Sequence, residues 1–213
     1  LKPILYAGML NDGMILPTTL IPDVPLNING FMPQNFTKTF YGAVPARRAI
    51  ERSLNVPLVR MLAQYNTGRF MNLLRSCGMT TLHFSETHYG VSLILGGAEG
   101  TLWDMAGMYA SLARTMKHYR QYNGRYDRSD IHPLTAYPAE KREPITSVSD
   151  RRLSDKSTLS YPSLWLIKLS ISGLTRRGEE PDCQQFEEMK NVAWKTASSN
   201  GGRYALPMGV TPR

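Results

Sequence analysis

Apolar residues recur at helical spacing in several parts of the chain. The run at residues 2–10, with Ile4, Leu5 and Met9, predicts a helix that ends at the Asn11-Asp12-Gly13 stop signal. The same criterion predicts further helices at residues 46–52, 56–65, 67–77, 102–116 and 161–174. Thr101 is a suitable N-cap for the helix at 102–116. The pattern therefore indicates a helix-rich domain.

The remaining segments lack helical spacing. Residues 191–198 are typical of a strand, and residues 209–211 of the beginning of a neighbouring strand. Residues 14–45 are rich in proline, asparagine and glycine, which predicts a long extended connection of the kind that often lines a site. The polar residues 117–158 predict surface loops or short strands.

The composition is that of an ordinary folded protein, with 42% hydrophobic and 20% charged residues in 213. Neither an internal repeat nor an interior linker divides the chain, so we expect one domain at residues 1–213. No apolar run reaches the roughly 20 residues that cross a bilayer, and no signal peptide opens the chain. Because both ends read as interrupted elements, we expect a domain truncated at both ends, with any anchor or export signal outside it.

The formal net charge of +8 favours anionic partners. The basic residues are scattered or lie in polar segments, without the spacing of a nucleic-acid-binding module, so we expect a solvated basic surface and no nucleic-acid partner. Cys77, Cys183 and the four histidines show no metal-ligand spacing, which predicts no metal and no cofactor. A single disulfide is open to the two cysteines, but two independent thiols are favoured. The three tryptophans are expected in the core: Trp103, Trp165 and Trp194.

Three short elements carry side chains that are suited to catalysis or substrate binding. They are Lys2 at the start of a helix, Ser53-Leu54-Asn55 between two helices, and Lys195-Thr196-Ala197 on a strand. Taken singly, Ser53 fits a helix cap, Asn55 a turn residue and Lys195 a solvated strand lysine. Their order and surroundings favour a shared site over these separate structural roles.

The surroundings of the Ser-x-Asn triplet are distinctive. Residues 33–35 (PQN), Gly42 and residues 44–57 (VPARRAIERSLNVP) resemble the segment that leads into this motif in bifunctional penicillin-binding proteins. Residues 89–99 (YGVSLILGGAE), followed by Thr101-Leu102, are similar to a segment of the penicillin-binding protein 1C subgroup.

The C-terminal part extends this resemblance. Residues 192–196 (VAWKT) and 209–213 (GVTPR) resemble the Lys-Thr-Gly strand and turn of that subgroup, whereas residues 117–158 match it least. The resemblance implies an α+β fold of the serine β-lactamase/DD-transpeptidase kind. In that fold a helical cluster packs on an antiparallel sheet, which we expect to be incomplete within these residues.

The resemblance also implies an acyl-serine mechanism built on Ser-x-x-Lys, Ser-x-Asn and Lys-Thr-Gly motifs. Lys2 takes the place of the first lysine, whose partner serine would lie three residues earlier, outside the sequence. Lys2 would accept the proton of that serine. Ser53 would relay a proton to the leaving amine, and Asn55 would hold the backbone of the donor peptide.

The strand carries the substrate-binding roles that the family implies. Lys195 and Thr196 would bind the terminal carboxylate of D-alanyl-D-alanine or of a β-lactam, and Lys195 would lower the pKa of Lys2. The backbone N–H of Ser198 would form half of an oxyanion hole. Ala197 stands where the family has glycine, and its methyl group puts activity in doubt.

The leading hypothesis is therefore a serine-type DD-transpeptidase that cross-links peptidoglycan stem peptides ending in D-Ala-D-Ala and binds β-lactam antibiotics. A membrane anchor, a glycosyltransferase domain and a periplasmic location are implied by the bifunctional class, and other cell-wall synthesis proteins are potential partners. Residues 1–213 alone are expected to be inactive. The alternatives are a non-catalytic scaffold module, which Ala197 favours, and a β-lactamase, which the approach at residues 33–44 disfavours.

Overall fold

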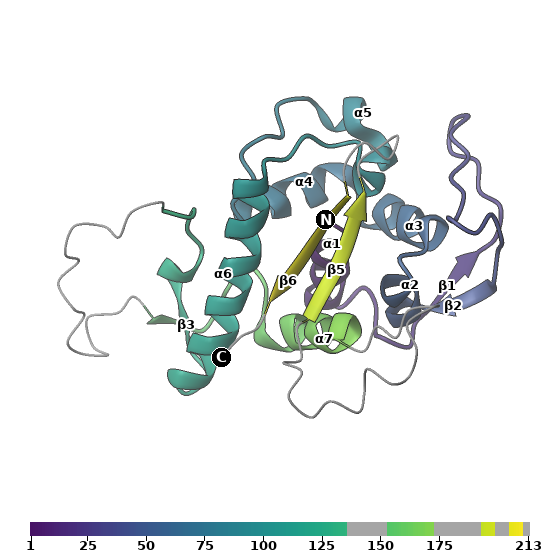
Figure 1. Ribbon diagram of the computed structural model, residues 1–213. Coiled ribbons are helices and arrows are strands. Elements are labelled where there is room, and N and C mark those ends of the chain that lie inside the picture. The colour runs from purple at the N-terminus through teal and green to yellow at the C-terminus, as the bar shows by residue number, and fades with distance from the viewer. Residues whose placement is uncertain (136–152, 173–192, 199–204, 211–213) are drawn as a thin grey trace.

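Helix α1 (Lys2–Asn11) runs through the centre of the protein (Figure 1). The computed structural model describes residues 1–135, 153–172, 193–198 and 205–210, with only some of the side chains in the last two segments. Every residue of α1 from Pro3 to Met9 is buried, as expected for a helix that is apolar on all sides. A Cβ atom at Gly8 would lie 2.5 Å from the Leu73 side chain, so glycine permits this close packing.

Four helices pack around α1: α2 (Ala46–Glu51), α3 (Asn55–Tyr65), α4 (Thr67–Ser76) and α7 (Tyr161–Ser172). The chain also forms α5 (Glu86–Tyr89), the 3-10 helix η1 (Gly90–Leu95) and α6 (Leu102–Gln121). The helices expected from hydrophobic spacing are confirmed to within a few residues at their described ends. Thr101 is the N-cap of α6, where its hydroxyl accepts the amide of Asp104 at 3.0 Å.

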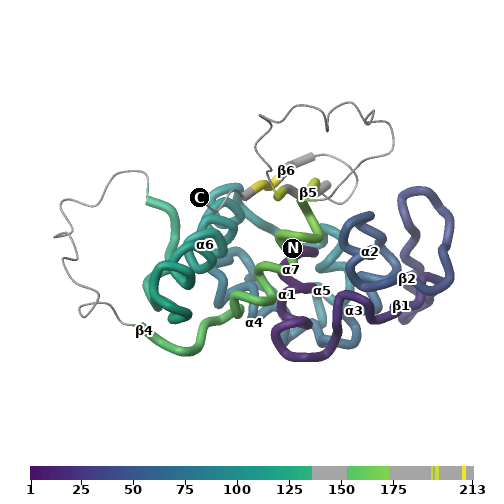
Figure 2. The backbone as a smooth tube through the Cα atoms, turned by 90° about the horizontal axis from the view of Figure 1, so that it is seen from below, coloured from purple at the N-terminus to yellow at the C-terminus, as the bar shows by residue number. Residues whose placement is uncertain are grey.

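Within the described residues, the strands form three antiparallel pairs. β1 (Leu20–Asp23) pairs with β2 (Gly42–Pro45), and β3 (Tyr126–Asp127) pairs with β4 (Leu153–Ser154). β5 (Ala193–Ser198) pairs with β6 (Ala205–Val210), with Lys195 opposite Met208. α7 packs on β5 and α6 on β6, so this pair lies along one side of the helical cluster (Figure 2). The expected α+β arrangement with a partial antiparallel sheet is confirmed.

Several sequence-based expectations need correction. Residues 14–45 are largely irregular, but they contain β1 and β2, and α6 continues to Gln121 into the segment expected to be loops. Trp103 and Trp165 are 49% and 39% exposed, so their assignment to the core was wrong. α6 buries small and polar residues such as Gly107 and Ser111, which hydropathy alone does not identify. The Trp194 side chain lies outside the described part.

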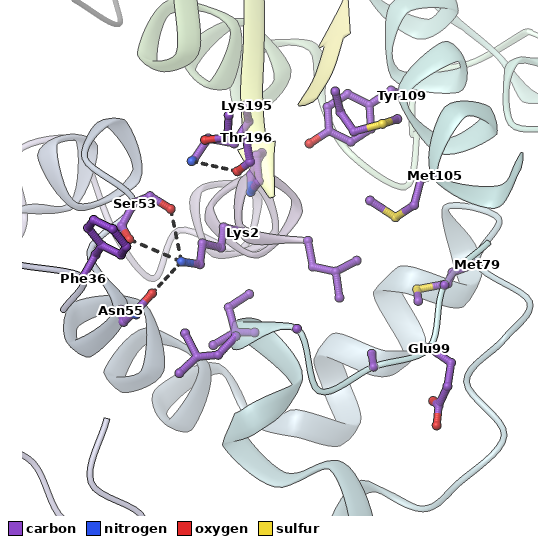
Figure 3. A pocket seen from close by; sticks show the side chains of 18 of the residues that line it. Lys2, Phe36, Ser53, Asn55, Met79, Glu99, Met105, Tyr109, Lys195 and Thr196 are labelled. Carbon is purple, nitrogen blue, oxygen red and sulfur yellow. Dashed lines mark hydrogen bonds between the residues drawn. The ribbon is translucent and has the colours of Figure 1, made fainter. Parts of the chain in front are cut away.

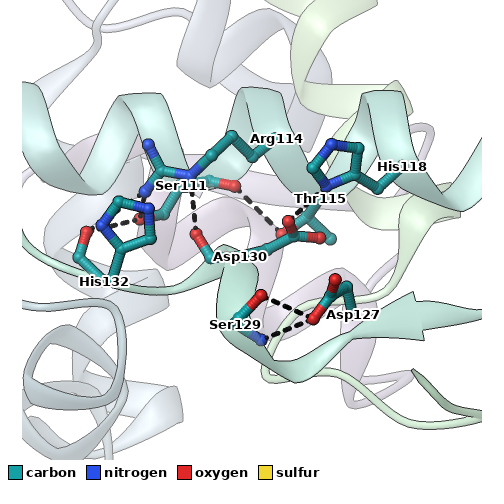
Figure 4. A network of polar contacts seen from close by, with 8 residues as sticks. All are labelled: Ser111, Arg114, Thr115, His118, Asp127, Ser129, Asp130 and His132. Carbon is teal, nitrogen blue, oxygen red and sulfur yellow. Dashed lines mark hydrogen bonds and ion pairs between the residues drawn. The ribbon is translucent and has the colours of Figure 1, made fainter. Parts of the chain in front are cut away.

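A polar network fastens the segment after α6 to that helix (Figure 4). The Arg114 guanidinium donates to the carbonyls of Asp130 at 2.9 Å and His132 at 3.1 Å, and His118 Nδ1 lies 2.5 Å from Asp130 Oδ1. Asp130, in the 3-10 helix η2 (Arg128–Asp130), is only 2% exposed. Burial raises the pKa of its carboxyl group, against the opposing effect of His118.

Cys77 at the end of α4 is a free, buried thiol, and burial raises its pKa to about 12. Cys183 lies outside the described residues, as do the pairs of basic residues at 141–142, 151–152 and 176–177. Where the chain is described, its helices are too short or too polar to cross a membrane.

Candidate active site

A cavity of about 960 Å³ opens between α1, the Ser53 turn, the segment after η1, and β5 (Figure 3). It brings together five of the residues singled out in the sequence: Lys2, Ser53, Asn55, Lys195 and Thr196. These residues come from three segments that are distant in the sequence. The fold therefore creates the convergence, because no local structure could do so.

Lys2 is the side chain on which the polar contacts of the site converge. Its Nζ donates to Asn55 Oδ1 at 2.8 Å and to Ser53 Oγ at 3.1 Å. A longer contact of 3.3 Å reaches the Ser53 carbonyl. Because α1 is buried from Pro3 to Met9, the position of Lys2 is set by the core of the domain.

The charge state of Lys2 is strongly perturbed. Burial, and then the positive charge of Lys195, lower the pKa of Lys2 from 10.5 to about 7. A substantial fraction of the amine is therefore neutral at physiological pH and can accept a proton. A lysine in this state has the property that a general base requires.

Ser53 occupies a strained turn at the end of α2. The amide of Leu54 donates to the Ala49 carbonyl at 3.0 Å and the amide of Ser53 to the Ile50 carbonyl at 3.2 Å, which is the Schellman pattern. This pattern requires a left-handed residue, usually glycine, and Ser53 adopts it with φ of 55°. A serine here retains a hydroxyl at a backbone position that favours glycine, and such strain is typical of functional sites.

Asn55 is the first residue of α3, and its amide group is oriented from two sides. Its Nδ2 donates to the Gln34 carbonyl at 2.9 Å, while its Oδ1 accepts from Lys2. The residue after Gln34, Asn35, accepts the backbone amides of Asn55 at 2.9 Å and Val56 at 3.2 Å. The irregular segment 14–45 thus does contact the site, as its composition suggested.

β5 places Lys195 and Thr196 on the opposite wall of the cavity. Lys195 is only 5% exposed, and its Nζ donates to the Thr196 carbonyl at 3.1 Å. Thr196 is exposed to the cavity. A buried cation beside an accessible hydroxyl can bind a carboxylate by a charge-assisted hydrogen bond.

Ala197 and Ser198 continue β5, where they pair with Leu206 and Ala205 of β6. Their side chains lie outside the described part of the structure. The effect of the Ala197 methyl group and the oxyanion-hole role of Ser198 therefore stay predictions.

Sequence reasoning missed the largely apolar residues that line the rest of the cavity. They include Met79, Ile94, Met105, Tyr109 and Met208. Apolar residues at helical spacing look the same whether they face a core or a cavity, so pattern alone could not single them out. One available signal was the turn at residues 96–100, since Gly96 and Gly100 line the cavity beside Glu99.

Metal binding was judged improbable from residue spacing. In the part of the chain that the structure describes, no three His, Cys, Asp or Glu side chains are grouped to hold a metal ion.

The fold matches that of solved penicillin-binding proteins. PonA1 of Mycobacterium tuberculosis superposes with a TM-score of 0.67 at 17% identity, covering 99% of this chain and 56% of that one. Penicillin-binding protein 1A of Haemophilus influenzae gives 0.65 at 18% identity, covering 98% and 35% of the respective chains. The fold is therefore that of penicillin-binding proteins, as the sequence resemblance implied.

Sequence comparison names particular relatives. The chain is 30% identical over 213 residues to penicillin-binding protein 1C of Escherichia coli (strain K12), which is all of this chain and 24% of that protein. Penicillin-binding protein 1A of Rickettsia conorii is 23% identical over 230 residues, or 28% of its length. The chain is homologous to penicillin-binding proteins 1C and 1A and spans about a quarter of their length. No protein-family model matches it.

Proposed function

We propose that this chain forms the acyl-transfer site of a peptidoglycan DD-transpeptidase that also binds β-lactams. The observation that carries the proposal is the amine of Lys2, which has a pKa near 7 and contacts Ser53 and Asn55 in a cavity that also exposes Thr196. Relatives of the chain are named as penicillin-binding proteins, and PonA1 has been solved in complex with penicillin V. The whole protein's activity is inferred from these relatives.

The proposed nucleophile is a serine three residues before Lys2, outside the sequence. A helix places residues at this spacing on one face, so the Lys2 amine would take the hydroxyl proton as the serine oxygen attacks the penultimate D-alanine carbonyl. The peptide bond to the last D-alanine breaks, and its nitrogen receives a proton through Ser53. An amine of a second stem peptide then displaces the serine, which regains its proton.

The substrate is held by both walls of the cavity. Lys195 and Thr196 pair with the terminal carboxylate, and the Asn55 amide with the donor backbone. The backbone N–H of Ser198 stabilises the oxyanion together with the backbone N–H of the nucleophilic serine. A β-lactam offers the same carboxylate and a reactive carbonyl, so it acylates the same serine.

The location and partners follow from this role. Stem peptides ending in D-Ala-D-Ala lie outside the inner membrane, so we place the site in the periplasm, on a protein anchored by a segment outside residues 1–213. A glycosyltransferase domain in the same protein and contacts with other cell-wall synthesis proteins are part of this proposal.

The test is covalent labelling of the full-length protein with a fluorescent penicillin. We expect a stoichiometric adduct, found by peptide mass spectrometry on the serine three residues before Lys2 and absent when that serine is changed to alanine. Residues 1–213 alone should give no adduct. A protein that folds and never labels would be a scaffold, and one that hydrolyses penicillin with turnover would be a β-lactamase.

A further inference from the structure

A second polar cluster contacts Asn55 of the candidate site and takes no part in the mechanism described above. Asp23 at the end of β1 is fully buried, and Asn35 in the following segment is 3% exposed. Asn35 Nδ2 donates to the two Asp23 carboxylate oxygens at 2.8 and 3.0 Å. The same carboxylate accepts the backbone amide of Tyr41 at 3.0 Å. A buried carboxylate with several donors fixes the groups that surround it.

Asn35 joins this cluster to the start of α3. Its Oδ1 accepts the amides of Asn55 and Val56, two of the donors that a helix cannot satisfy within its own first turn. Leu54, which precedes α3, provides no side-chain cap. Asn35 therefore caps α3 from a segment 20 residues earlier in the chain.

The cap also orients the side chain that contacts Lys2. Asn55 Nδ2 donates to the carbonyl of Gln34, the residue next to Asn35, which turns Asn55 Oδ1 towards Lys2 Nζ. The Asp23–Asn35 pair thus holds the backbone amide of Asn55 directly, and the adjacent Gln34 holds its side chain. Neither Asp23 nor Asn35 lines the cavity itself.

We infer that Asn35, held by Asp23, is a positioning residue that fixes Asn55 against the Lys2 amine and so controls both the rate of acylation and the pH at which Lys2 becomes a base. This rests on the proposed function. An asparagine is needed because Oδ1 must accept two amides while Nδ2 donates to Asp23. An aspartate at position 35 would bring two carboxylates together.

The direction of the pH effect follows from the contact. Asn55 Oδ1 accepts a hydrogen bond from Lys2, which favours the charged form of the amine. Losing the fixed acceptor lowers the pKa of Lys2 below its present value of about 7. The substitution replaces none of the other charged or titratable side chains that line the cavity: Lys195 on β5, Arg52 after α2, Glu99 after η1 and Tyr109 on α6.

The first test compares Asn35→Ala with wild type in the full-length protein by acylation with fluorescent penicillin from pH 5.5 to 9. We expect the acylation rate constant per labelled site to fall roughly tenfold to a hundredfold. The acid limb of the pH–rate profile, where the rate falls as Lys2 is protonated, should move to lower pH. Asn27→Ala is the matched control, because Asn27 lies in the same segment and its Oδ1 accepts the backbone amide of Gly30 at 2.8 Å. This variant should leave the rate constant and its pH dependence unchanged. An unchanged rate constant and acid limb in Asn35→Ala would overturn the inference.

The second test does not depend on activity. Competitive acetylation of Lys2 with acetic anhydride, read by mass spectrometry across the same pH range, follows the neutral amine directly. Asn35→Ala should shift this titration to lower pH. The double variant Asp23→Asn/Asn35→Asp should return it towards wild type, because the amide introduced at position 23 would then donate to the carboxylate introduced at position 35. An unshifted Lys2 titration in Asn35→Ala contradicts the inference even in a folded protein. Failure of the wild-type protein to be acylated would contradict the proposed function and would leave the positioning role of Asn35 to the Lys2 titration.

Discussion

Lys195 on β5 and Lys2 on α1 face the same cavity, and the positive charge of Lys195 is one reason why the pKa of Lys2 is lowered to about 7. The other and larger reason is burial of Lys2. Two lysines that share a cavity disfavour each other's charged form, so a change at one residue is felt as a titration change at the other.

Changing Lys195 to Gln in the full-length protein should therefore affect acylation in two ways. The rate should fall by about a hundredfold or more at neutral pH, since the ligand carboxylate loses its cation. The acid limb should move to higher pH, because Lys2 without its positive neighbour keeps its proton longer. The measurement is the acylation rate by penicillin against pH, with the exposed Lys117→Gln on α6 as the control. An acid limb that stays in place would show that Lys195 does not act on Lys2.

The strained turn at Ser53 predicts a separation of stability from activity. Ser53→Gly and Ser53→Ala both remove the hydroxyl that Lys2 contacts, so both should reduce acylation to a similar extent. Glycine accepts the φ of 55° without strain, whereas alanine does not. The glycine variant should be the more stable of the two by about 1 kcal/mol in chemical denaturation. Equal stabilities would mean that the turn relaxes when the serine is lost.

Ala197 offers a direct test of a departure from the Lys-Thr-Gly pattern that the sequence resemblance implies. Ala197→Gly should leave acylation by penicillin equal or faster, because the smaller residue lets a ligand lie closer to β5. The rate constant should be compared at saturating and limiting penicillin, so that binding and chemistry are separated. A clear loss of rate would show that the methyl group is accommodated and useful in this protein.

Cys77 should be unreactive in the folded protein. It is 2% exposed, and burial raises its pKa to about 12, so almost no thiolate is present at pH 8. Alkylation of Cys77 by iodoacetamide, followed by mass spectrometry of its peptide, should be at least about a hundredfold slower in the native than in the denatured protein. Rapid alkylation under native conditions would indicate that the end of α4 opens readily.

The helical part of the fold was predictable because α1, α3 and α4 follow from local spacing and stop signals. β1 and β2 were not, since each is only four residues long and their pairing is a tertiary property. Motif order singled out Lys2, Ser53 and Lys195, which the structure brings to one cavity. The capping role of Asn35 could not be read from sequence, because it depends on two segments meeting in space.

Asp130 gives the last prediction, which concerns stability away from the cavity. Its carboxyl group is buried beside Arg114 and His118, Oδ2 has no hydrogen-bond partner within the described structure, and its pKa is raised chiefly by burial. A carboxyl whose pKa is higher in the folded than in the unfolded state stabilises the fold when protonated, and this contribution is lost as the pH rises through the folded pKa. Wild type should therefore gain stability relative to Asp130→Asn as the pH is lowered from 7 towards the unfolded pKa of the carboxyl. Urea denaturation of both proteins at several pH values measures this difference, and Asp155→Asn, at a position whose side chain is 87% exposed, is the control that should show little trend. A difference between wild type and Asp130→Asn that does not change with pH would mean that the carboxyl group is ionised equally easily in both states.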